Sequence, residues 1–257
     1  MSILDRFRLD GQVAVVTGAG KGIGRAIAIG LAEAGADVAI GARTAADLEA
    51  VAGEIRARGR RALVIPTDST NMAALEALAK RASDELGPIT IWVSNAGGIP
   101  DGTPRYLTKT SEESWDAMID LNLKSVWMGA VVAAAQMKEN GGVIINTSSR
   151  ASYGPQVKNG PYGAAKAGVN SLTATLSREL APKIRVNAVA PGPIPTENFD
   201  DCMGTDSEEK REQLREMIQI PLKRFGSEED IAAATLYLAS PAAGWVTGQC
   251  LFVTGGL

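Results

Sequence analysis

The stretch Val13-Ala14-Val15-Val16-Thr17-Gly18-Ala19-Gly20-Lys21-Gly22-Ile23-Gly24 decides the fold of this chain. Val13 to Val16 is a short apolar run, which is typical of a buried parallel strand. The glycines follow directly, and apolar residues at helical spacing then continue to Gly35. The segment therefore predicts a strand, a glycine turn and a helix. Such a turn lets backbone amides and a helix N-terminus approach a phosphate, although it also occurs as a tight turn without a ligand.

The spacing of the glycines distinguishes this turn from two common nucleotide-binding motifs. Gly18, Gly20, Gly22 and Gly24 do not follow the Gly-x-Gly-x-x-Gly pattern, and Lys21 lacks the glycine spacing and the Ser or Thr of a P-loop. Because a strand and a helix flank the turn, we favour phosphate binding.

Strands and helices alternate along the rest of the chain. Strands are predicted at 38–41, 62–66, 89–94, 143–147, 184–189 and 249–253, and helices at 45–58, 72–86, 111–139, 227–239 and in a segment that carries Tyr162 and Lys166 and ends near residue 180. This alternation predicts an α/β fold with a doubly wound parallel sheet and helices on both faces. We expect a single domain over residues 1–257, with a polar, acid-rich substrate lid at about 197–220.

Composition excludes several classes of function. The net charge is -3 with acids and bases interspersed, so nothing favours nucleic acid or an anionic membrane as a partner. No apolar run is expected to span a membrane, and the N-terminus lacks a signal-peptide core, which predicts a cytoplasmic protein. Cys202 and Cys250 lie far apart, which argues against a disulfide framework. Histidine is absent, which removes every imidazole metal site, and we expect no metal in the protein. Acid/base chemistry must then come from Tyr, Lys, Asp or Glu.

Tyr162 and Lys166 stand four residues apart and therefore lie on one face of a helix. A lysine ammonium beside a phenol stabilises the phenolate, which would let the tyrosine exchange protons near neutral pH. The alternative is that the two side chains merely share a solvated helix face, and the residue pair alone does not decide between them.

The end of the second predicted strand indicates which dinucleotide would bind. Folds that bind NAD usually present an acid to the adenosine ribose there, whereas a basic residue accommodates the 2′-phosphate of NADP. This chain has Ala42 and Arg43 at that point, and Lys21 supplies a second cation in the glycine turn. NADP(H) is therefore the preferred cofactor, unless both cations are simply surface residues.

Several motifs, in order along almost the whole chain, resemble those of the short-chain dehydrogenase/reductase family. Thr17 to Gly24 matches its Thr-Gly-x-x-x-Gly-x-Gly turn, and Ser94-Asn95-Ala96-Gly97 resembles its Asn-Asn-Ala-Gly segment, departing only at Ser94. Ser149 precedes Tyr162 by the family's interval, whereas the adjacent Ser148 does not, and Tyr162-x-x-x-Lys166 matches the family signature.

The resemblance implies a Rossmann-like fold and assigns roles to individual residues. The catalytic group would be Asn122, Ser149, Tyr162 and Lys166. The cofactor would contact Gly18, Lys21, Gly22, Ile23, Gly24, Arg43, Asp68, Ser69, Asn95, Ala96, Gly97, Tyr162, Lys166, Pro191, Gly192, Ile194 and Thr196. The implied reaction is hydride transfer between a nicotinamide and a carbonyl carbon, with Tyr162 as the acid/base. Asn122 has an alternative role, because a buried helix asparagine often only satisfies a neighbouring carbonyl.

Substrate and assembly are less closely defined by the sequence. A pocket lined by residues 150–155, 99–106 and 197–220 would contain Tyr153, Tyr106, Phe199, Met203 and Met217, which suits a cyclic or steroid-like ketone. The pattern is similar to the bacterial hydroxysteroid dehydrogenase and 3-oxoacyl-carrier-protein reductase branches, and the acid-rich lid disfavours an acidic carrier protein. A noncatalytic NADP(H)-sensing scaffold is the alternative of another class. Family analogy implies a homotetramer.

Overall fold

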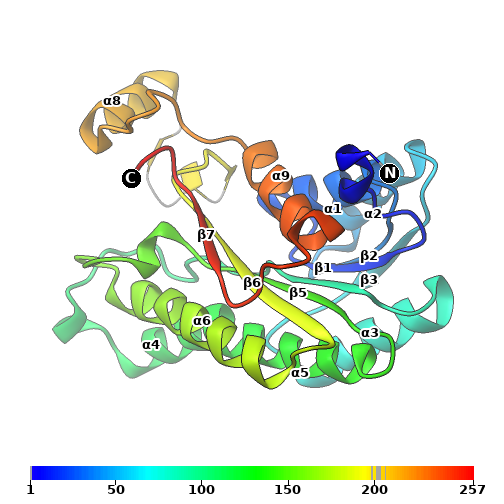
Figure 1. The fold of residues 1–257 in the computed structure, drawn as a ribbon. Helices are drawn as coiled ribbons and strands as arrows, with labels where there is room; N and C mark the ends of the chain where they lie inside the picture. Colours follow the sequence, from blue (N-terminus) through cyan, green and yellow to red (C-terminus); the bar gives the residue numbers. More distant parts are fainter. Residues whose placement is uncertain (1, 198, 201–203, 206) are drawn as a thin grey trace.

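A seven-stranded parallel sheet organises the protein, with strand order β3-β2-β1-β4-β5-β6-β7 (Figure 1). The computed structural model describes residues 2–197, 199–200, 204–205 and 207–257. Its strands are β1 (Val13–Thr17), β2 (Asp37–Ala42), β3 (Ala62–Pro66), β4 (Ile91–Ser94), β5 (Gly142–Thr147), β6 (Ile184–Pro191) and β7 (Cys250–Val253). The chain runs outward from β1 to β3 and then returns to β4 beside β1, so the direction of winding reverses between β1 and β4. Ligands of open α/β sheets bind at such a switch point.

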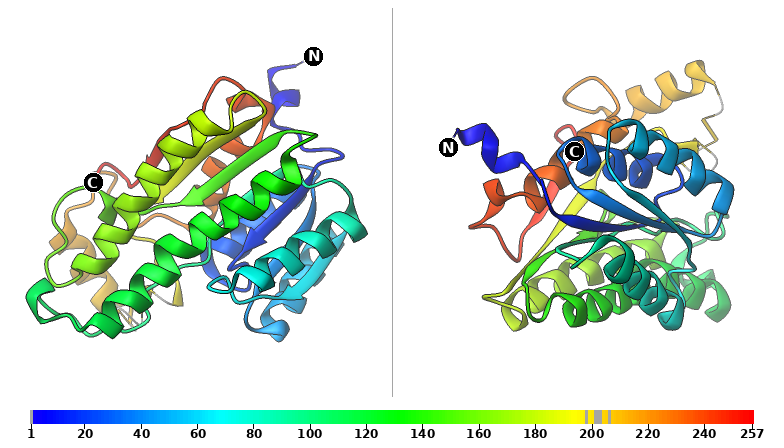
Figure 2. Two further views of the ribbon diagram at one scale, coloured as in Figure 1. Left: turned by 90° about the horizontal axis from the view of Figure 1, so that it is seen from below. Right: turned by 90° about the vertical axis from the view of Figure 1, so that its right-hand side faces the viewer.

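Helices cover both faces of this sheet, as the sequence predicted. The principal helices are α1 (Gly22–Glu33), α2 (Ala45–Ala57), α3 (Met72–Leu86), α4 (Glu112–Ile119), α5 (Ser125–Met137), α6 (Gly160–Glu179), α8 (Glu208–Ile218) and α9 (Glu228–Ala239). Figures 1 and 2 show α1, α2 and α9 on one face and α3, α5 and α6 on the other. The two faces have separate apolar cores, one against α1, α2 and α9 and the other against α3 and α5.

Burial explains why β1 is so strongly apolar. All five residues of Val13–Thr17 are buried, because the strand is covered by helices on both faces and paired on both edges. The predicted strands and helices agree with the observed ones to within about two residues at each end, as element boundaries usually do.

The predicted helix at 111–139 is present but is interrupted. A π-helical turn, η3 (Asp120–Lys124), separates α4 from α5. Hydrophobic periodicity does not reveal a single widened turn, and such turns occur often at functional sites.

The span Glu112–Met137 is also long and apolar enough to cross a membrane, which corrects the expectation that no stretch reaches that length. Half of its most apolar window is buried inside the protein.

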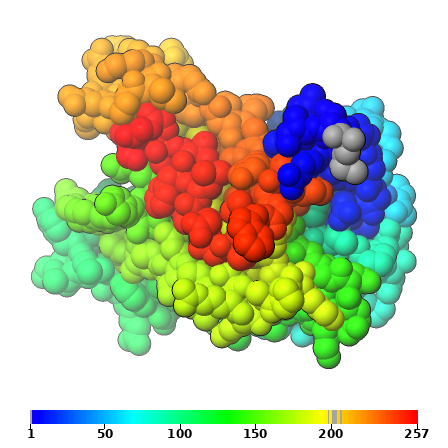
Figure 3. Space-filling view, viewed as in Figure 1, coloured from blue at the N-terminus to red at the C-terminus, as the bar shows by residue number. Residues whose placement is uncertain are grey.

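The predicted lid region contains α8, which lies apart from the sheet. No residue of α8 is buried, and Ser207 caps its N-terminus by accepting a hydrogen bond from the Lys210 amide. Figure 3 shows a notch between this helix, drawn orange, and the green segments below it. Short 3-10 turns complete the described structure: η1 (Ile3–Phe7), η2 (Leu107–Lys109), η4 (Arg150–Ser152) and η5 (Pro241–Ala243).

Candidate active site

The glycine turn between β1 and α1 leads directly into the first turn of that helix. Gly18 and Gly22 have positive φ values of 65° and 56°, a conformation that favours glycine. Lys21, the N-cap of α1, makes no side-chain cap hydrogen bond, and the first helical turn contains no acid. The amides of that turn therefore suit an anionic pyrophosphate, because both hydrogen bonds and the helix dipole favour a negative charge there.

Asn95 joins the end of β4 to this turn. Its side-chain amide donates to the carbonyl oxygens of Thr17 and Gly18, both at 3.2 Å, and its backbone amide donates to the Thr17 hydroxyl at 3.1 Å. A Cβ on Gly18 would lie 2.7 Å from the Ala96 Cα, so only glycine fits. These contacts bring the predicted cofactor residues at 18–24 and 95–97 together at the switch point.

The end of β2 carries Ala42 and the exposed Arg43, as the sequence indicated. Hydrogen bonds from the Thr70 amide and hydroxyl, with Arg43 nearby, hold the pKa of Asp68 below its ordinary value. Asp68 and Arg43 thus lie close together beside the buried Ser69. This edge of the sheet is where the adenosine half of a dinucleotide is expected.

The sequence reasoning overlooked an acid at the same place. Asp47 belongs to the first turn of α2, and a Cβ on Gly20 would lie 3.1 Å from the Asp47 Cβ and 3.6 Å from the Ala42 Cβ. The Lys21 ammonium lies 3.9 Å from Asp47 and 3.0 Å from Glu197. Asp47 follows the end of β2 by five residues, so the sequence alone could have indicated an acid near that end. The approach of Glu197 to Lys21 is a tertiary contact, which the sequence does not reveal.

Lys166 is the most deeply buried cation of the site. Its side chain on α6 is 2% exposed, and burial lowers the pKa of Lys166 to about 8. Its Nζ donates to the Thr147 carbonyl oxygen at 2.9 Å and lies 5.7 Å from the centroid of the Tyr162 ring. The prediction that Tyr162 and Lys166 lie on one helix face is therefore correct, and a solvated face is excluded for Lys166.

Asn122 lies in the π-helical turn and is fully buried. Its side-chain amide donates to the Gly98 carbonyl at 2.7 Å and to the Met118 carbonyl at 3.1 Å, and its side-chain oxygen accepts from the Gly98 amide at 3.0 Å. A Cβ on Gly97 would lie 3.0 Å from this oxygen and 3.3 Å from the Lys166 Nζ. Asn122 thus satisfies neighbouring carbonyl groups, as its purely structural role requires, and it also lies next to Lys166.

The structure distinguishes the two adjacent serines. The Ser148 hydroxyl is buried and donates to Asn170 Oδ1 at 2.6 Å, so it serves the packing of α6 against β5. Ser149 is half-buried at the start of η4, and its hydroxyl accepts from the Ala151 amide at 3.1 Å. Ser149 is therefore the more accessible of the two serines, and η4 packs against α6, the helix that carries Tyr162.

The segment after β6 closes over the glycine turn. Ile194 is buried, and the Thr196 amide donates to the Ile194 carbonyl at 2.8 Å. A Cβ on Gly22 would lie 3.3 Å from Thr196 Cγ2, so this segment reaches the first turn of α1. Pro191 is the last residue of β6 and pairs with Val253 of β7, and the next residue, Gly192, packs against the Thr254 backbone. Residues 191–196 and 18–24 therefore face each other.

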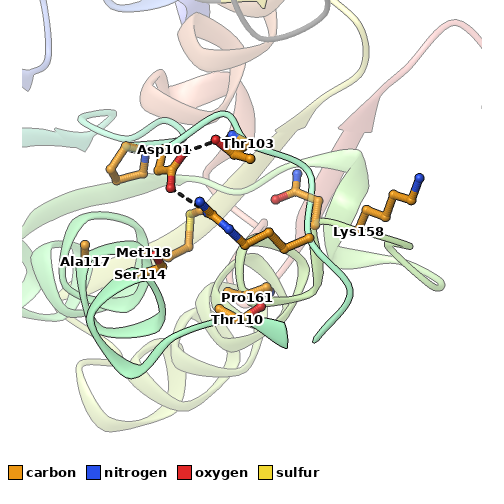
Figure 4. A pocket seen from close by; sticks show the side chains of 11 residues that line it. Asp101, Thr103, Thr110, Ser114, Ala117, Met118, Lys158 and Pro161 are labelled. Carbon is orange, nitrogen blue, oxygen red and sulfur yellow. Dashed lines mark hydrogen bonds and ion pairs between the residues drawn. The ribbon is translucent and has the colours of Figure 1, made fainter. Parts of the chain in front are cut away.

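A small cavity of about 50 Å³ lies next to the catalytic candidates (Figure 4). Met118, which contacts Asn122, and Pro161, which precedes Tyr162, both line it. The cavity shares Pro100, Asp101, Thr103 and Arg105 with the predicted substrate pocket, and Lys158 points away from it. Hydrogen bonds from Thr103 and Arg105 lower the pKa of Asp101.

The other predicted pocket residues are mostly accessible. Tyr106, Tyr153 and Met217 are exposed, and Phe199 packs against Phe225 with ring centroids 6.1 Å apart. Met203 lies outside the described residues, as does Cys202, while Cys250 is a half-buried free thiol.

Comparison with known proteins identifies the family. A family model described as enoyl-(acyl carrier protein) reductase matches residues 18–257. An uncharacterized oxidoreductase of Mycobacterium tuberculosis is 41% identical over 99% of this chain and 95% of its own. The chain belongs to the short-chain dehydrogenase/reductase family. It is an oxidoreductase of that family, and its single parallel sheet with helices on both sides agrees with the solved members.

Two further relatives of the family have named activities. A 3-oxoacyl-[acyl-carrier-protein] reductase of Staphylococcus aureus is 40% identical over 95% of this chain and 97% of its own. A solved structure of a 7α-hydroxysteroid dehydrogenase, complexed with NADH and 7-oxo glycochenodeoxycholic acid, has a TM-score of 0.90 and 38% sequence identity. The match covers 100% of this chain and 98% of that one. The similarity to two such different enzymes leaves the substrate of this chain to be proposed from its own residues.

Proposed function

We propose that this protein is an NADP(H)-dependent oxidoreductase that interconverts a ketone and a secondary alcohol, with Tyr162 as the acid/base. One observation carries the proposal: the Lys166 ammonium is buried under the Tyr162 ring, at the edge of the sheet where the glycine turn opens. Burying a cation costs free energy unless an opposite charge or hydrogen bonds compensate it. A phenolate on Tyr162 would be such an opposite charge, and the ammonium would stabilise it in turn.

The roles proposed for the side chains combine the family resemblance with their positions. A nicotinamide bound between the glycine turn and Tyr162 would supply or accept the hydride. Tyr162 donates a proton to the alkoxide oxygen during reduction and removes it during oxidation, and the half-buried Ser149 hydroxyl hydrogen-bonds the same oxygen. Lys166 lowers the proton affinity of Tyr162 and would donate hydrogen bonds to the ribose hydroxyls of the cofactor. Asn122 supports a path for protons from Lys166 to solvent.

The preference for NADP(H) rests on Arg43. It is exposed at the end of β2, beside Asp68, and a guanidinium binds phosphate with a planar pair of donors. The 7α-hydroxysteroid dehydrogenase relative was solved with NADH, so the family includes a member that binds the cofactor without a 2′-phosphate. Residue 42, at the strand end, is where an acid would select NAD(H).

Replacing Ala42 with aspartate is therefore expected to shift the preference towards NADH. The new carboxylate repels a 2′-phosphate and accepts hydrogen bonds from the ribose hydroxyls of NADH. We expect the ratio of kcat/KM for NADPH to that for NADH to fall at least tenfold, which corresponds to about 1.4 kcal/mol. Ala42→Asn is the matched uncharged control. An unchanged ratio in Ala42→Asp would contradict the assignment of this end of the sheet.

The substrate is proposed to be a small cyclic or steroid-like ketone or alcohol. Tyr106, Tyr153 and Met217, which the sequence places in the substrate pocket, and the neighbouring Leu107 have exposed apolar side chains, which suits a ring system. A 3-oxoacyl thioester is the second candidate, favoured by the similarity to the Staphylococcus aureus reductase. The predicted lid at 197–220 contains eight acidic residues against three basic ones, which argues against docking an acidic carrier protein.

NADPH oxidation by the purified protein tests the proposal. The panel contains steroid ketones, cyclic and aromatic ketones, sugars and a 3-oxoacyl thioester, with NADH in parallel. Turnover of ring ketones with NADPH supports the proposal, and turnover of the thioester alone selects the reductase. Tight NADPH binding without turnover of any substrate would favour the noncatalytic sensor instead.

We further propose a cytoplasmic homotetramer, with α4 to α6 in one interface and β7 in another. Trp115, Trp127 and Val131 are 38%, 45% and 44% exposed on the α4 to α5 helix, and Trp127 and Val131 lie one turn apart on one face. Exposed apolar groups of this size on one helix commonly mark an interface.

Trp127→Glu is expected to split the tetramer into smaller species. A carboxylate in an apolar interface loses hydration without gaining a partner, which opposes association. Light scattering at micromolar concentration measures the mass, and Met217→Glu on the exposed α8 serves as a control for added charge. A monomeric wild-type protein, or a variant that remains tetrameric, would contradict this interface.

A further inference from the structure

The Lys21 ammonium lies between carboxylates from two distant parts of the chain. Its Nζ is 3.0 Å from Glu197 Oε2, at the start of the predicted lid, and 3.9 Å from Asp47 Oδ2, in the first turn of α2. The Lys21 and Glu197 side chains are 57% and 66% exposed, whereas Asp47 is 31% exposed. The cation that was expected to favour a 2′-phosphate is therefore already engaged by two anions.

Asp47 places these charges at the edge of the sheet where the adenosine half of a dinucleotide is expected. The built Cβ of Gly20 approaches both the Ala42 Cβ and the Asp47 carboxylate, the latter at 3.9 Å. Asp47, in the first turn of α2, thus lies near the end of β2, where the ribose 2′ substituent is expected. A carboxylate there repels a phosphate dianion. Lys21 would have to divide its attraction among Glu197, Asp47 and the phosphate, because a lysine carries a single compact charge on a flexible stem.

We propose that Glu197 and Asp47 are specificity-determining residues that weaken the selection of NADP(H) by competing with the 2′-phosphate for Lys21. This inference rests on the proposed cofactor. Arg43 provides the phosphate preference, and the two acids reduce what Lys21 adds to it. Glu197 gives the cleaner test, since Asp47 also interacts with the N-terminal dipole of α2 and its removal alters the helix.

Binding of two cofactor fragments isolates the effect of the 2′-phosphate. Adenosine 2′,5′-bisphosphate and 5′-AMP differ only in that group, and calorimetry measures their Kd values without any turnover. Glu197→Gln is expected to raise the affinity for the bisphosphate relative to 5′-AMP about two- to fivefold, the range that an exposed ion pair can contribute. The gain should shrink at high ionic strength, because exposed charges are screened.

Two further variants make the test specific. Glu209→Gln removes the same charge from an exposed position on α8 and should leave the ratio of the two affinities unchanged. Combining Lys21→Ala with Glu197→Gln should abolish the gain, because the proposal acts through the Lys21 ammonium.

The proposal fails if Glu197→Gln leaves the ratio of affinities unchanged or improves both ligands equally. It also fails if the gain persists without Lys21, or if neither fragment binds. Failure of the proposed function has a different signature, which is the absence of turnover across the ketone panel while the ratio of fragment affinities still responds to Glu197→Gln.

Discussion

Tyr162→Phe should lower turnover about a thousandfold, within the range that one acid/base group contributes. The substitution removes only the hydroxyl that exchanges the proton, and it keeps the ring 5.7 Å from the Lys166 ammonium. Packing of α6 and the glycine turn stay the same, so the Kd for NADPH should change little. Steady-state kinetics with the best substrate of the panel, together with fluorescence titration of NADPH, separates the two effects.

Tyr237→Phe is the matched control for this prediction. Tyr237 lies on α9, on the opposite face of the sheet, where its ring packs 6.4 Å from that of Phe7. Loss of its hydroxyl should leave both turnover and NADPH affinity close to wild type. Near-normal turnover of Tyr162→Phe would remove Tyr162 from the mechanism, and an equal loss in Tyr237→Phe would point to a general structural effect.

The fold could be predicted from sequence because its signals are local. The fully buried β1 appears as an uninterrupted apolar run, and Gly18 and Gly22 adopt the left-handed conformation that glycine favours. The four-residue spacing of Tyr162 and Lys166 likewise gives their shared helix face without any tertiary information.

Other features depend on contacts between distant segments, which the sequence does not reveal. Glu197 meets Lys21 across 176 positions, and the Thr147 carbonyl receives the Lys166 ammonium across 19. The π-helical turn at Asn122 shifts the register by one residue within an apolar helix, where the hydrophobic pattern remains almost unchanged. Burial of Lys166 is also invisible to sequence, since Lys is rarely found inside a protein.

That burial leads to a second large effect, on stability as well as activity. Lys166→Met is expected to abolish measurable turnover and to raise the free energy of unfolding at pH 7 by about 1–2 kcal/mol. Lowering the pKa of Lys166 from 10.5 to about 8 by burial means that folding with this ammonium charged costs on the order of 3 kcal/mol. Methionine removes that cost but leaves the Thr147 carbonyl without its donor, which offsets about 1 kcal/mol.

The pH dependence distinguishes this cause from simple repacking. Below pH 8, Lys166 is charged in both the folded and unfolded states, so the full cost of burial is present. Between about 8 and 10.5 the folded protein binds fewer protons than the unfolded chain, and the cost falls as pH rises. The stability advantage of Lys166→Met over wild type should therefore narrow across that range. Urea unfolding at pH 7, 9 and 10, at equal protein concentration, measures it.

Lys124→Met provides the comparison with an exposed lysine. Lys124 is 53% exposed and pairs with Asp120 at 3.0 Å, so its loss should change stability by no more than about 0.5 kcal/mol, with little pH dependence. A Lys166→Met protein that is less stable than wild type at pH 7, or whose advantage is constant up to pH 10, would mean that the buried ammonium is not held at a cost. The protein would then keep a charged Lys166 in its active site without the loss of unfolding free energy that burial of this ammonium implies.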